Sequence, residues 1–429
     1  MVKNKMKKCF FSIAGLGVVG SGLVKLWRDQ RENIRKTLGL DLVLYSVAEP
    51  DQNKVKLVNL KNVKVFKDWR KLLEDKNSQI CVELIGGKNT AKDCILSSLE
   101  KGKDVVTANK ALLAEEYFKI FSVAKKNKRK ISFEASVAGG IPIIKILRES
   151  YLTSSVHTIY GILNGTTNFI LTKMQEERLP FFEALKEAQK KGFAEKNPSL
   201  DIDGIDAAHK AVILANLAFK TVVPFDKVKI SGLRGFDLLD FDYARELGYI
   251  VKLLAVVRKA GPEDLEVYVE PVLLSEDHPM ASVKNEFNAV YTDSSVVGES
   301  LFYGKGAGSM PTANSVLSDI IDLASLSERA FQPLSNNLKK WNINRNIMNR
   351  YYIRFTTPDR PGVLGSIAGI LGKCGVSILS CVQKPGHERY VSVVMMTHIC
   401  SYKSLDKAIS LIYKNSHVVK NRPVVLTVR

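Results

Sequence analysis

Cysteine is scarce in this sequence, and the long interval between Cys94 and Cys374 contains none. No two of the six cysteines have CxxC spacing, which excludes a dense disulfide framework and predicts reduced thiols. No apolar run approaches the roughly 18 residues that span a membrane, and the run CFFSIA near the N-terminus is too short for a signal peptide. The sequence therefore predicts a cytoplasmic protein.

An arginine-rich tail is also missing, although the net charge is +19. The lysines are spread over every segment, and no basic run is interleaved with aromatic residues as in a nucleic-acid stacking surface. We interpret the excess charge as a solvated surface that helps to attract anionic cofactors and substrates, and we expect neither nucleic acid nor a membrane as a partner. With 429 residues, 45% of them hydrophobic, the chain predicts a soluble globular protein of two or three domains.

A glycine loop lies close to the start of the chain. The segment KCFFSIAGLGVVGSGLVKLW reads as a short strand, a loop and an amphipathic helix. The loop fits GxGxxG and consists of Gly15, Leu16, Gly17, Val18, Val19 and Gly20. Between a strand and a helix, these glycines allow a tight turn, the approach of a pyrophosphate and close helix packing, and the helix amides face the phosphates. The segment therefore predicts a dinucleotide-binding Rossmann domain.

Glu49 follows the second predicted strand, residues 42–47. A carboxylate at this edge accepts hydrogen bonds from the ribose hydroxyls of NAD and repels the additional phosphate of NADP. No arginine stands beside it, which favours NAD, although Lys54 and Lys56 would still be able to reach a phosphate.

Thr107 and Lys110 lie where a later strand ends. Residues 80–85 and 104–107 are predicted strands with a helix between them, and such strands form a parallel sheet that binds its ligands beyond the carboxyl ends. Lys110 is then either a solvated residue at a helix start or an anion clamp beside the nicotinamide.

Glu134 precedes a loop of small residues that ends at Pro142. A carboxylate near glycines that expose their carbonyls can form an all-oxygen site for a hard cation. The alternative is that the glycines only turn the chain from the strand that begins at Ile131 into the helix that Pro142 begins.

The middle of the chain is predicted to be α+β, with strands near residues 157–163, 228–231, 265–273 and 295–303. The loop Asn164-Gly165-Thr166 precedes a helix, so it either caps that helix or binds a polar ligand with its amides. A second glycine loop, residues 303–312, is either another phosphate-facing turn or a connector that returns to the first domain.

The stretch GFAEKNPSLDIDGIDAAHK, residues 192–210, concentrates charge just before an apolar helical run. Asp206 and Lys210 share one helix face, either as an exposed ion pair or as an acid/base pair oriented for catalysis. A calcium loop is excluded because, counted from Asp201, that motif requires glycine at the sixth position and Glu at the twelfth, whereas Gly204 is fourth and Val212 is twelfth. His209 is interpreted as a neighbour of the site rather than a metal ligand.

The C-terminal part follows a polar linker that begins near Asn336. Strands and helices are predicted at residues 351–355, 362–374, 376–384, 389–397, 404–413 and 424–428. Their order β-α-β-β-α-β predicts a ferredoxin-like module.

Taken in order, these motifs resemble homoserine dehydrogenase of the type that carries a C-terminal ACT domain. The similar motifs are GLGVVG, TANKALLA, EASVAGGIPII, GILNGTTNFIL, GFAEKNPSLDIDGIDAAHK, YGKGAGSMPTA and TPDRPGVLGSIAGILG. The resemblance covers essentially the whole chain and implies an α/β protein. Its domains would be a Rossmann domain at 1–137 completed by about 305–325, a catalytic α+β domain at 138–304, a linker at 326–347 and an ACT domain at 348–429.

The resemblance implies NAD(P)H-dependent reduction of L-aspartate 4-semialdehyde to L-homoserine, a step towards threonine and methionine. It also implies an amino-acid effector, commonly threonine, at the ACT domain, and a homodimer or higher homo-oligomer.

Roles in the family carry over to residues of this chain by motif. Lys210 matches the proton donor, Asp206 its close partner, and Lys110 the lysine beside nicotinamide and substrate. The substrate site would comprise Glu195 for the amino group, with Asp201, Asn164, Gly165 and Thr166. The cofactor site would comprise Gly15, Gly17, Val18, Val19, Gly20, Glu49, Thr107, Lys110 and Gly306. A sodium site would comprise Glu134 and the carbonyls of Val137, Gly139 and Ile141.

The sequence departs from the family in one respect, since members that use NADP often carry an arginine where this chain has Ala48-Glu49.

An acylating aldehyde dehydrogenase is disfavoured because the substrate domain lacks a nucleophilic cysteine. A non-catalytic sensor that couples a dinucleotide domain to an ACT module remains an alternative, and it would be expected to lack the acid/base residues.

Overall fold

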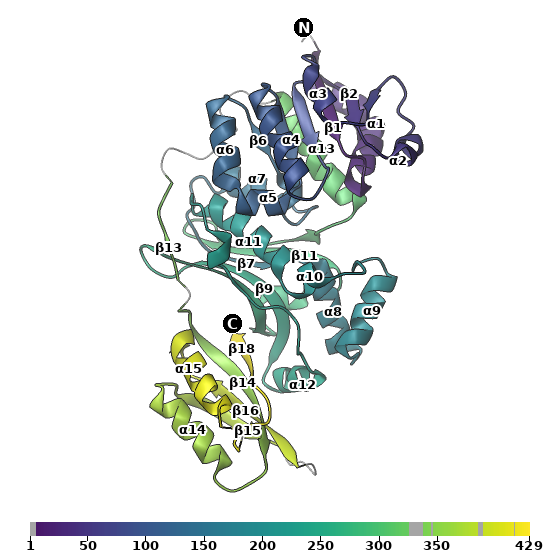
Figure 1. The fold of residues 1–429 in the computed structure, drawn as a ribbon. Coiled ribbons are helices and arrows are strands. Elements are labelled where there is room, and N and C mark those ends of the chain that lie inside the picture. Colours follow the sequence, from purple (N-terminus) through teal and green to yellow (C-terminus); the bar gives the residue numbers. More distant parts are fainter. Residues whose placement is uncertain (1–5, 326–337, 345, 385–388, 416) are drawn as a thin grey trace. The chain divides into compact units, whose positions relative to one another are not determined.

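The computed structural model describes residues 6–325, 338–344, 346–384, 389–415 and 417–429 (Figure 1). The chain forms two compact units, and each draws on distant segments. The first unit comprises residues 1–157, 209–225 and 288–340, and the second comprises residues 158–208, 226–287 and 341–429. Most of the predicted linker, residues 326–337, lies outside the described residues. No helix in the described part of the chain is long and apolar enough to cross a membrane.

The first unit is built on a parallel sheet of six strands. They are β1 (Lys7–Ala14), β2 (Leu40–Ala48), β3 (Lys64–Phe66), β4 (Ile80–Glu83), β5 (Asp104–Thr107) and β6 (Ile131–Ser132). Their order is β3-β2-β1-β4-β5-β6, which is the strand order of a Rossmann domain. The order reverses between β1 and β4, so the carboxyl ends of these two strands mark the expected ligand crevice. The predicted fold class is confirmed.

Helices cover both faces of this sheet. The helices of this part are α1 (Val18–Leu38), α2 (Gln52–Val58), α3 (Arg70–Glu74), α4 (Asn89–Glu100), α5 (Lys110–Glu115), α6 (Tyr117–Lys126) and α13 (Ser309–Ser325). Phe11 and Ile13 of β1 share a buried apolar cluster with α1 and α13, whereas Ala14 packs in a second cluster with α3 and α4. Because neighbouring side chains alternate between two covered faces, the last four residues of β1 are all buried.

The strand predicted to begin at Ile131 already ends at Ser132. A 3-10 turn, Glu134–Ser136, follows β6, because the backbone N–H of Glu134 donates to the carboxylate of Asp319 at 2.8 Å instead of to a strand. The chain then forms α7 (Ile143–Lys145) and one π-helical turn, η2 (Ile146–Ser150).

The second unit contains the α+β middle of the chain. Its strands here are β7 (Val156–Ile162), β8 (Lys229–Ile230), β9 (Tyr249–Lys259) and β10 (Asp264–Ser275). Its helices here are α8 (Gly165–Glu176), α9 (Phe181–Lys190), α10 (Ser199–Ile202) and α12 (Leu238–Glu246). Helix α11 (Ile205–Ala218) contributes residues to both units, whereas β11 (Phe287–Ser294) and β12 (Gly298–Lys305) belong almost entirely to the first.

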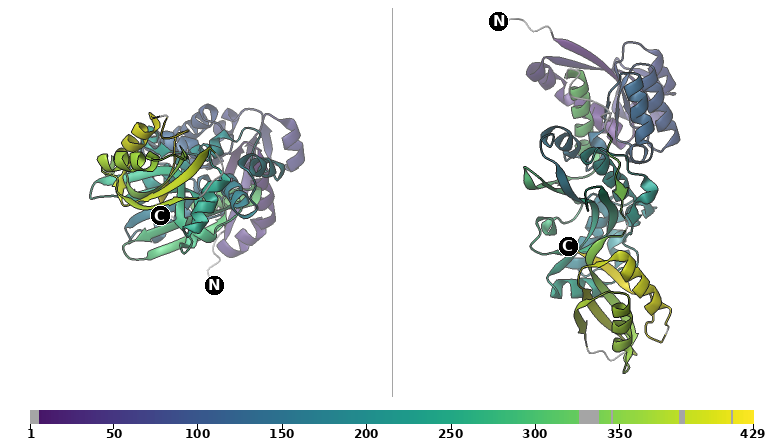
Figure 2. Two further views of the ribbon diagram at one scale, coloured as in Figure 1. Left: turned by 90° about the horizontal axis from the view of Figure 1, so that it is seen from below. Right: turned by 90° about the vertical axis from the view of Figure 1, so that its left-hand side faces the viewer.

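The C-terminal module, residues 348–429, belongs to the second unit. It consists of β14 (Met348–Pro358), α14 (Val363–Lys373), β15 (Ile378–Gln383), β16 (Tyr390–Thr397), β17 (Cys400–Ser401), α15 (Tyr402–Tyr413) and β18 (Val424–Val428). Both helices share one buried cluster with β14 and β16 and lie on one face of the module's sheet (Figure 2). The predicted ferredoxin-like order is confirmed. Parallel pairing of β18 with β10 joins this sheet to that of the middle segment, and β13 (Asn342–Ile343) pairs with β10 as well.

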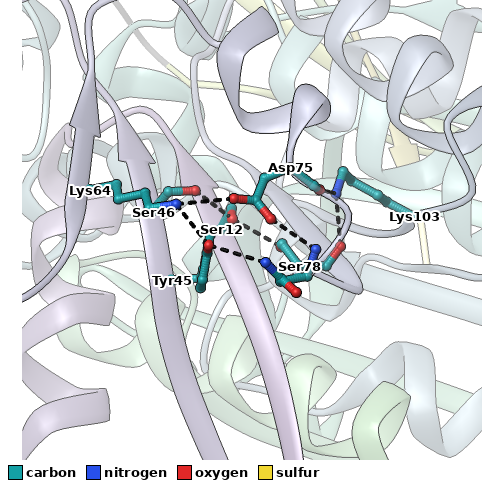
Figure 3. A network of polar contacts seen from close by, with 8 residues as sticks. Ser12, Tyr45, Ser46, Lys64, Asp75, Ser78 and Lys103 are labelled. Carbon is teal, nitrogen blue, oxygen red and sulfur yellow. Dashed lines mark hydrogen bonds and ion pairs between the residues drawn. The ribbon is translucent and has the colours of Figure 1, made fainter.

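A polar network lies at the amino ends of β3, β4 and β5 (Figure 3). The buried ammonium of Lys103 donates to the carbonyl oxygens of Asp75 at 2.6 Å and Ser78 at 2.7 Å. The hydroxyl of Ser78 accepts a hydrogen bond from that of Ser12 at 2.9 Å. Burial lowers the pKa of Lys103. The network is thus at the opposite edge of the sheet from the expected ligand crevice.

We expect Lys103→Met to lower the free energy of unfolding by about 2 kcal/mol, because the buried carbonyl of Ser78 and the partly buried carbonyl of Asp75 lose their donor. Turnover should stay close to that of the wild type, since the network is remote from the carboxyl ends of the strands. Urea denaturation and steady-state kinetics measure the two effects. Lys64→Met is the matched control, because the exposed Lys64 belongs to the same network and should contribute little.

Candidate active site

The first glycine loop has the geometry that the sequence predicts. Gly15 has φ = 101°, and a Cβ on it would lie 2.5 Å from the carbonyl oxygen of Leu84. A Cβ on Gly20 would lie 2.2 Å from the carbonyl oxygen of Gly15, so α1 packs directly against the loop. Gly17 is the N-cap of α1, and a Cβ there would meet no atom within 4 Å. The open approach to Gly17 and to Val18 and Val19 in the first helical turn fits a pyrophosphate.

Glu49 is buried at the end of β2 and bound to the glycine loop. Its Oε2 accepts the N–H of Leu16 at 2.7 Å, and its Oε1 accepts the N–H of Asp51 at 3.1 Å. The ammonium of Lys54 lies 3.9 Å from Oε1. The carboxylate is therefore fixed beside the loop, where it would meet the ribose hydroxyls of a dinucleotide.

Glu83 is a further residue at this edge, and its role was not predicted from the sequence. It is only 1% exposed at the end of β4, and burial raises its pKa. Its Oε2 accepts the hydroxyl of Thr107 at 2.6 Å, and Thr107 Oγ1 accepts the N–H of Asn109 at 3.0 Å. The side chain of Asn109 donates to the carbonyl of Gly87 at 2.7 Å and caps α5, whose first residue is Lys110. A chain of hydrogen bonds thus fixes the place where Lys110 begins its helix.

The second glycine loop leads the chain from β12 into α13. The hydroxyl of Ser309 donates to the carbonyl of Val18 at 2.9 Å, next to the first glycine loop. A Cβ on Gly139 would lie 2.7 Å from the carbonyl oxygen of Gly306. The loop is therefore a connector that returns to the Rossmann domain, and it also places Gly306 near the small residues that follow Glu134.

Glu134 caps the helical segment that follows it. Its Oε1 and Oε2 accept the N–H groups of Ile144 at 2.9 Å and Lys145 at 2.8 Å. Burial raises the pKa of Glu134 to about 7, and burial together with the nearby Glu134 raises the pKa of Asp319 well above its ordinary value. Sequence reasoning missed Asp319, whose partner is 185 positions away.

Two of the three carbonyls of the predicted sodium site, those of Gly139 and Ile141, already accept hydrogen bonds within the protein. The carbonyl of Gly139 accepts the hydroxyl of Ser315, and that of Ile141 accepts the N–H of Ile143 at 2.8 Å. Among the described residues, no group of three or more His, Cys, Asp or Glu side chains could hold a metal ion. A cation here would therefore depend on one carboxylate and on carbonyl oxygens such as that of Val137.

The second unit brings three predicted substrate-site residues together. The amide nitrogen of Asn164 donates to Asp201 at 2.7 Å and to Asp206 at 2.9 Å, while its oxygen caps α8 by accepting the N–H of Thr167. The predicted cap of α8 is therefore confirmed, and the same side chain also binds two carboxylates. Two carboxylates that converge on one amide form an electronegative site.

The neighbours of Asn164 are held tightly. The hydroxyl of Thr166 donates to the carbonyl of Phe193 at 2.6 Å, and a Cβ on Gly165 would lie 2.5 Å from the carbonyl oxygen of Glu286. Glu195 is exposed, and its backbone carbonyl accepts a hydrogen bond from the side chain of Gln189. Asp203 pairs with Arg234.

In the first unit, His209 connects helix α11, which contains Lys210, to helix α5, which begins with Lys110. Lys210 is buried in α11, and Lys110 opens α5. His209 Nε2 lies 3.1 Å from the carboxylate of Glu115 at the end of α5, and its ring stacks on Phe225 with centroids 4.5 Å apart. That His209 is a neighbour of the catalytic site stays a prediction.

A Rossmann sheet, a glycine loop at the amino end of α1 and a fixed carboxylate after β2 define a nicotinamide-dinucleotide-dependent oxidoreductase. Three family models match the chain. They are homoserine dehydrogenase NAD binding domain at residues 15–134, homoserine dehydrogenase at 142–321 and ACT domain at 351–416.

Relatives with known names agree. The chain is 40% identical to homoserine dehydrogenase of Neisseria gonorrhoeae, over 95% of each chain. It is similar to the crystal structure of a homoserine dehydrogenase from Thiobacillus denitrificans, with a TM-score of 0.92, 35% identity and 99% of each chain covered. It is also similar to a hyperthermophilic archaeal homoserine dehydrogenase in complex with NADPH, with a TM-score of 0.64, 29% identity, and 76% of this chain and 100% of that chain covered. The chain belongs to the homoserine dehydrogenase family and is an NAD(P)-dependent oxidoreductase.

Proposed function

We propose that this enzyme reduces L-aspartate 4-semialdehyde to L-homoserine on the route to threonine and methionine, with Lys210 as the proton donor. The observation that carries the proposal is the convergence of Asp201 and Asp206 on Asn164 at the start of the helix that contains Lys210. An electronegative site for an ammonium group and a buried lysine on one helix suit a zwitterionic aldehyde.

The chemistry assigns one task to each group. A bound NAD(P)H supplies the hydride to the aldehyde carbon. Negative charge then develops on the carbonyl oxygen, which the ammonium of Lys210 stabilises before it donates a proton. Asp206, four residues earlier on α11, orients that ammonium, and Asp201 attracts the substrate ammonium together with Glu195.

The remaining predicted residues bind and orient. Gly15, Gly17 and Gly20 with the first turn of α1 hold the pyrophosphate, and Glu49 the ribose. Lys110 and Thr107 lie at the carboxyl edge of β5, beside the expected nicotinamide, and Gly306 completes this side. Asn164, Gly165 and Thr166 shape the substrate pocket.

The test is the oxidation of NAD(P)H on addition of L-aspartate 4-semialdehyde. Turnover supports the proposal over the alternative of a non-catalytic sensor. Binding of the cofactor without any turnover by the intact protein would favour the sensor.

We expect the enzyme to accept NADH, because Glu49 stands where an additional ribose phosphate would be repelled. Glu49→Gln removes the charge and keeps an acceptor for the N–H of Leu16, so it should raise kcat/KM for NADPH relative to NADH by about tenfold. Steady-state kinetics with both cofactors measures the ratio. A large preference of the wild type for NADPH would contradict the expectation, and Lys54→Gln is the control for a phosphate bound by lysine.

We also propose that sodium binds at Glu134 and the carbonyls of Val137, Gly139 and Ile141, and the buried carboxylate of this site predicts a pH-dependent stability. The pKa of Glu134 is raised to about 7 in the folded state, so folding is favoured when this group is protonated. Without sodium, the free energy of unfolding should fall as the pH rises from about 4.5 to about 7, by up to about 3 kcal/mol. Sodium bound at Glu134 would offset this loss.

Urea denaturation at pH 5 and pH 8, in sodium chloride and in choline chloride, measures both effects. Glu134→Gln should reduce both the pH slope and the response to sodium. Asp322→Asn is the control, because Asp322 pairs with the nearby Lys145. Equal stability of the wild type in both salts at pH 8 would leave no role for sodium.

Four further proposals concern regulation, assembly, domains and location. An amino acid, with threonine as the first candidate, binds the ACT domain near residues 359–364, and calorimetry on the full chain tests this. The enzyme is a homo-oligomer, and sedimentation velocity, which reports the mass of the assembly, tests this.

The domain boundaries are those predicted at residues 137, 304 and 347. We also propose that the enzyme is located in the cytoplasm.

A further inference from the structure

Glu115 stands at an unfavourable place in helix α5. It is the last residue of the helix, where the partial negative charge of the helix C-terminus opposes a carboxylate. Burial alone would raise the pKa of Glu115, but hydrogen bonds from Lys88 and His209 outweigh burial and lower the pKa, so the group is ionised at neutral pH. The position of Glu115 is therefore explained by its two partners and not by the stability of α5.

The first partner connects the end of α5 to the loop that follows β4. The ammonium of Lys88 forms an ion pair with Oε1 of Glu115, and Lys88 directly follows Gly87. The same loop holds the beginning of α5, since the side chain of Asn109 donates to the carbonyl of Gly87 at 2.7 Å. Lys110 therefore opens a short helix that is fixed at both ends.

The second partner connects the end of α5 to helix α11. Nε2 of His209 lies 3.1 Å from the same Oε1 of Glu115, and an ionised carboxylate only accepts hydrogen bonds, so this nitrogen carries the proton. The ring of His209 also stacks on Phe225, with the two planes 22° apart, and its side chain is only 8% exposed. The imidazole is thus held at its edge and on its face.

This contact fixes the rotation of α11 about its own axis. Lys210 follows His209 directly and is buried in the same helix, and successive side chains of an α-helix are about 100° apart. A rotation of α11 that broke the contact between His209 and Glu115 would turn the Lys210 side chain by the same angle. A misplacement of about 1 Å at a reacting group can lower a rate about a hundredfold, so this anchor matters for catalysis.

We propose that Glu115 is a positioning residue, which acts through His209 to hold the ammonium of Lys210 in its catalytic direction relative to Lys110. The inference rests on the proposed function, in which Lys210 donates the proton. Glu115 acts on the geometry of the proton donor and not on the binding of the cofactor. Its loss should therefore lower kcat and leave KM for NADH nearly unchanged.

Steady-state kinetics on variants of the full-length protein tests the proposal. We expect Glu115→Ala to lower kcat for aldehyde reduction by about 30- to 100-fold. Glu115→Gln keeps an oxygen that accepts a hydrogen bond from His209, so its kcat should stay within about fivefold of that of the wild type. His209→Phe keeps the stacking on Phe225 and loses the hydrogen bond, so it should lower kcat as Glu115→Ala does.

Glu116→Ala is the matched control. The side chain of Glu116 is 32% exposed against 30% for Glu115, and it pairs with Lys92 as Glu115 pairs with Lys88. This variant loses an equivalent ion pair at the next position of the chain and should keep the kcat of the wild type. The urea midpoint of each variant shows whether it is folded at the temperature of the assay.

A double variant tests whether the two residues act as one unit. If Glu115 acts through His209, Glu115→Ala combined with His209→Phe should lower kcat no further than either change alone. Losses that multiply in the double variant would overturn the proposal, and so would a kcat of Glu115→Ala within about threefold of the wild type or an equal loss in Glu116→Ala.

The Lys210→Ala variant separates this proposal from the proposed function. An inactive Lys210→Ala enzyme together with a fully active Glu115→Ala enzyme would overturn the positioning role alone. A Lys210→Ala enzyme that keeps its turnover would refute Lys210 as the proton donor, and the positioning role would fail with it.

Discussion

Lys210→Ala should lower kcat for aldehyde reduction by about a thousandfold or more. The variant loses the group that stabilises the developing oxyanion and the group that donates the proton, and each effect contributes roughly a hundredfold or more. Binding of NADH should be unchanged, because the glycine loop and Glu49 make their contacts without Lys210. Steady-state kinetics and cofactor titration separate the two results.

Controls distinguish this role from a structural one. Lys210→Arg keeps the positive charge, but a guanidinium does not release its proton at neutral pH, so kcat should remain far below that of the wild type. Lys196→Ala removes an exposed lysine from the same charged stretch and should leave kcat unchanged. The urea midpoint of Lys210→Ala shows whether the variant is folded at the temperature of the assay, and Asp206 keeps its hydrogen bond from Asn164 in it. A loss in kcat smaller than about tenfold would refute Lys210 as the proton donor.

Features with a local cause were predictable from the sequence. Gly15 needs its positive φ and its contact with Leu84 within one strand-loop-helix unit, so the motif is readable without the fold. The C-terminal module was predictable for the same reason. Each of its six helices and strands is marked by its own spacing of apolar residues and is bounded by turn residues. The concentration of charged residues at 192–210 was also visible in the sequence. The sequence alone did not decide whether Asp206 and Lys210 form a surface ion pair or a catalytic pair.

Features that depend on distant partners were not predictable. Glu83 looked like one polar residue in an apolar strand, and its partner Thr107 becomes its neighbour only when β4 and β5 pair. The double role of Asn164 required the approach of Asp201 and Asp206, 37 and 42 positions away. For Glu195 the sequence could not indicate whether the side chain would face its neighbours, and the structure leaves it exposed.

The contact between α12 and the C-terminal module is a buried ion pair that was also not predictable, because its partners are distant in the sequence. Asp240 is fully buried, and its two oxygens accept Arg354 Nε at 2.6 Å and Nη2 at 2.8 Å. The hydroxyl of Tyr352 donates to the same carboxylate at 3.2 Å. Asp240 also accepts the N–H of Asp237 at the start of α12. One carboxylate therefore holds a helix end and a strand of the module together.

Asp240→Asn should lower the free energy of unfolding by about 3–5 kcal/mol, because the buried guanidinium of Arg354 loses its counter-charge. Urea denaturation measures the loss, and Asp242→Asn is the control on the same helix, since Asp242 pairs with the half-exposed Arg178 and should matter far less. Arg354→Met in the Asp240→Asn background removes the unpaired charge, so the double variant should be more stable than Asp240→Asn alone. If the double variant were less stable, the cost would come from lost packing and hydrogen bonds rather than from an uncompensated charge.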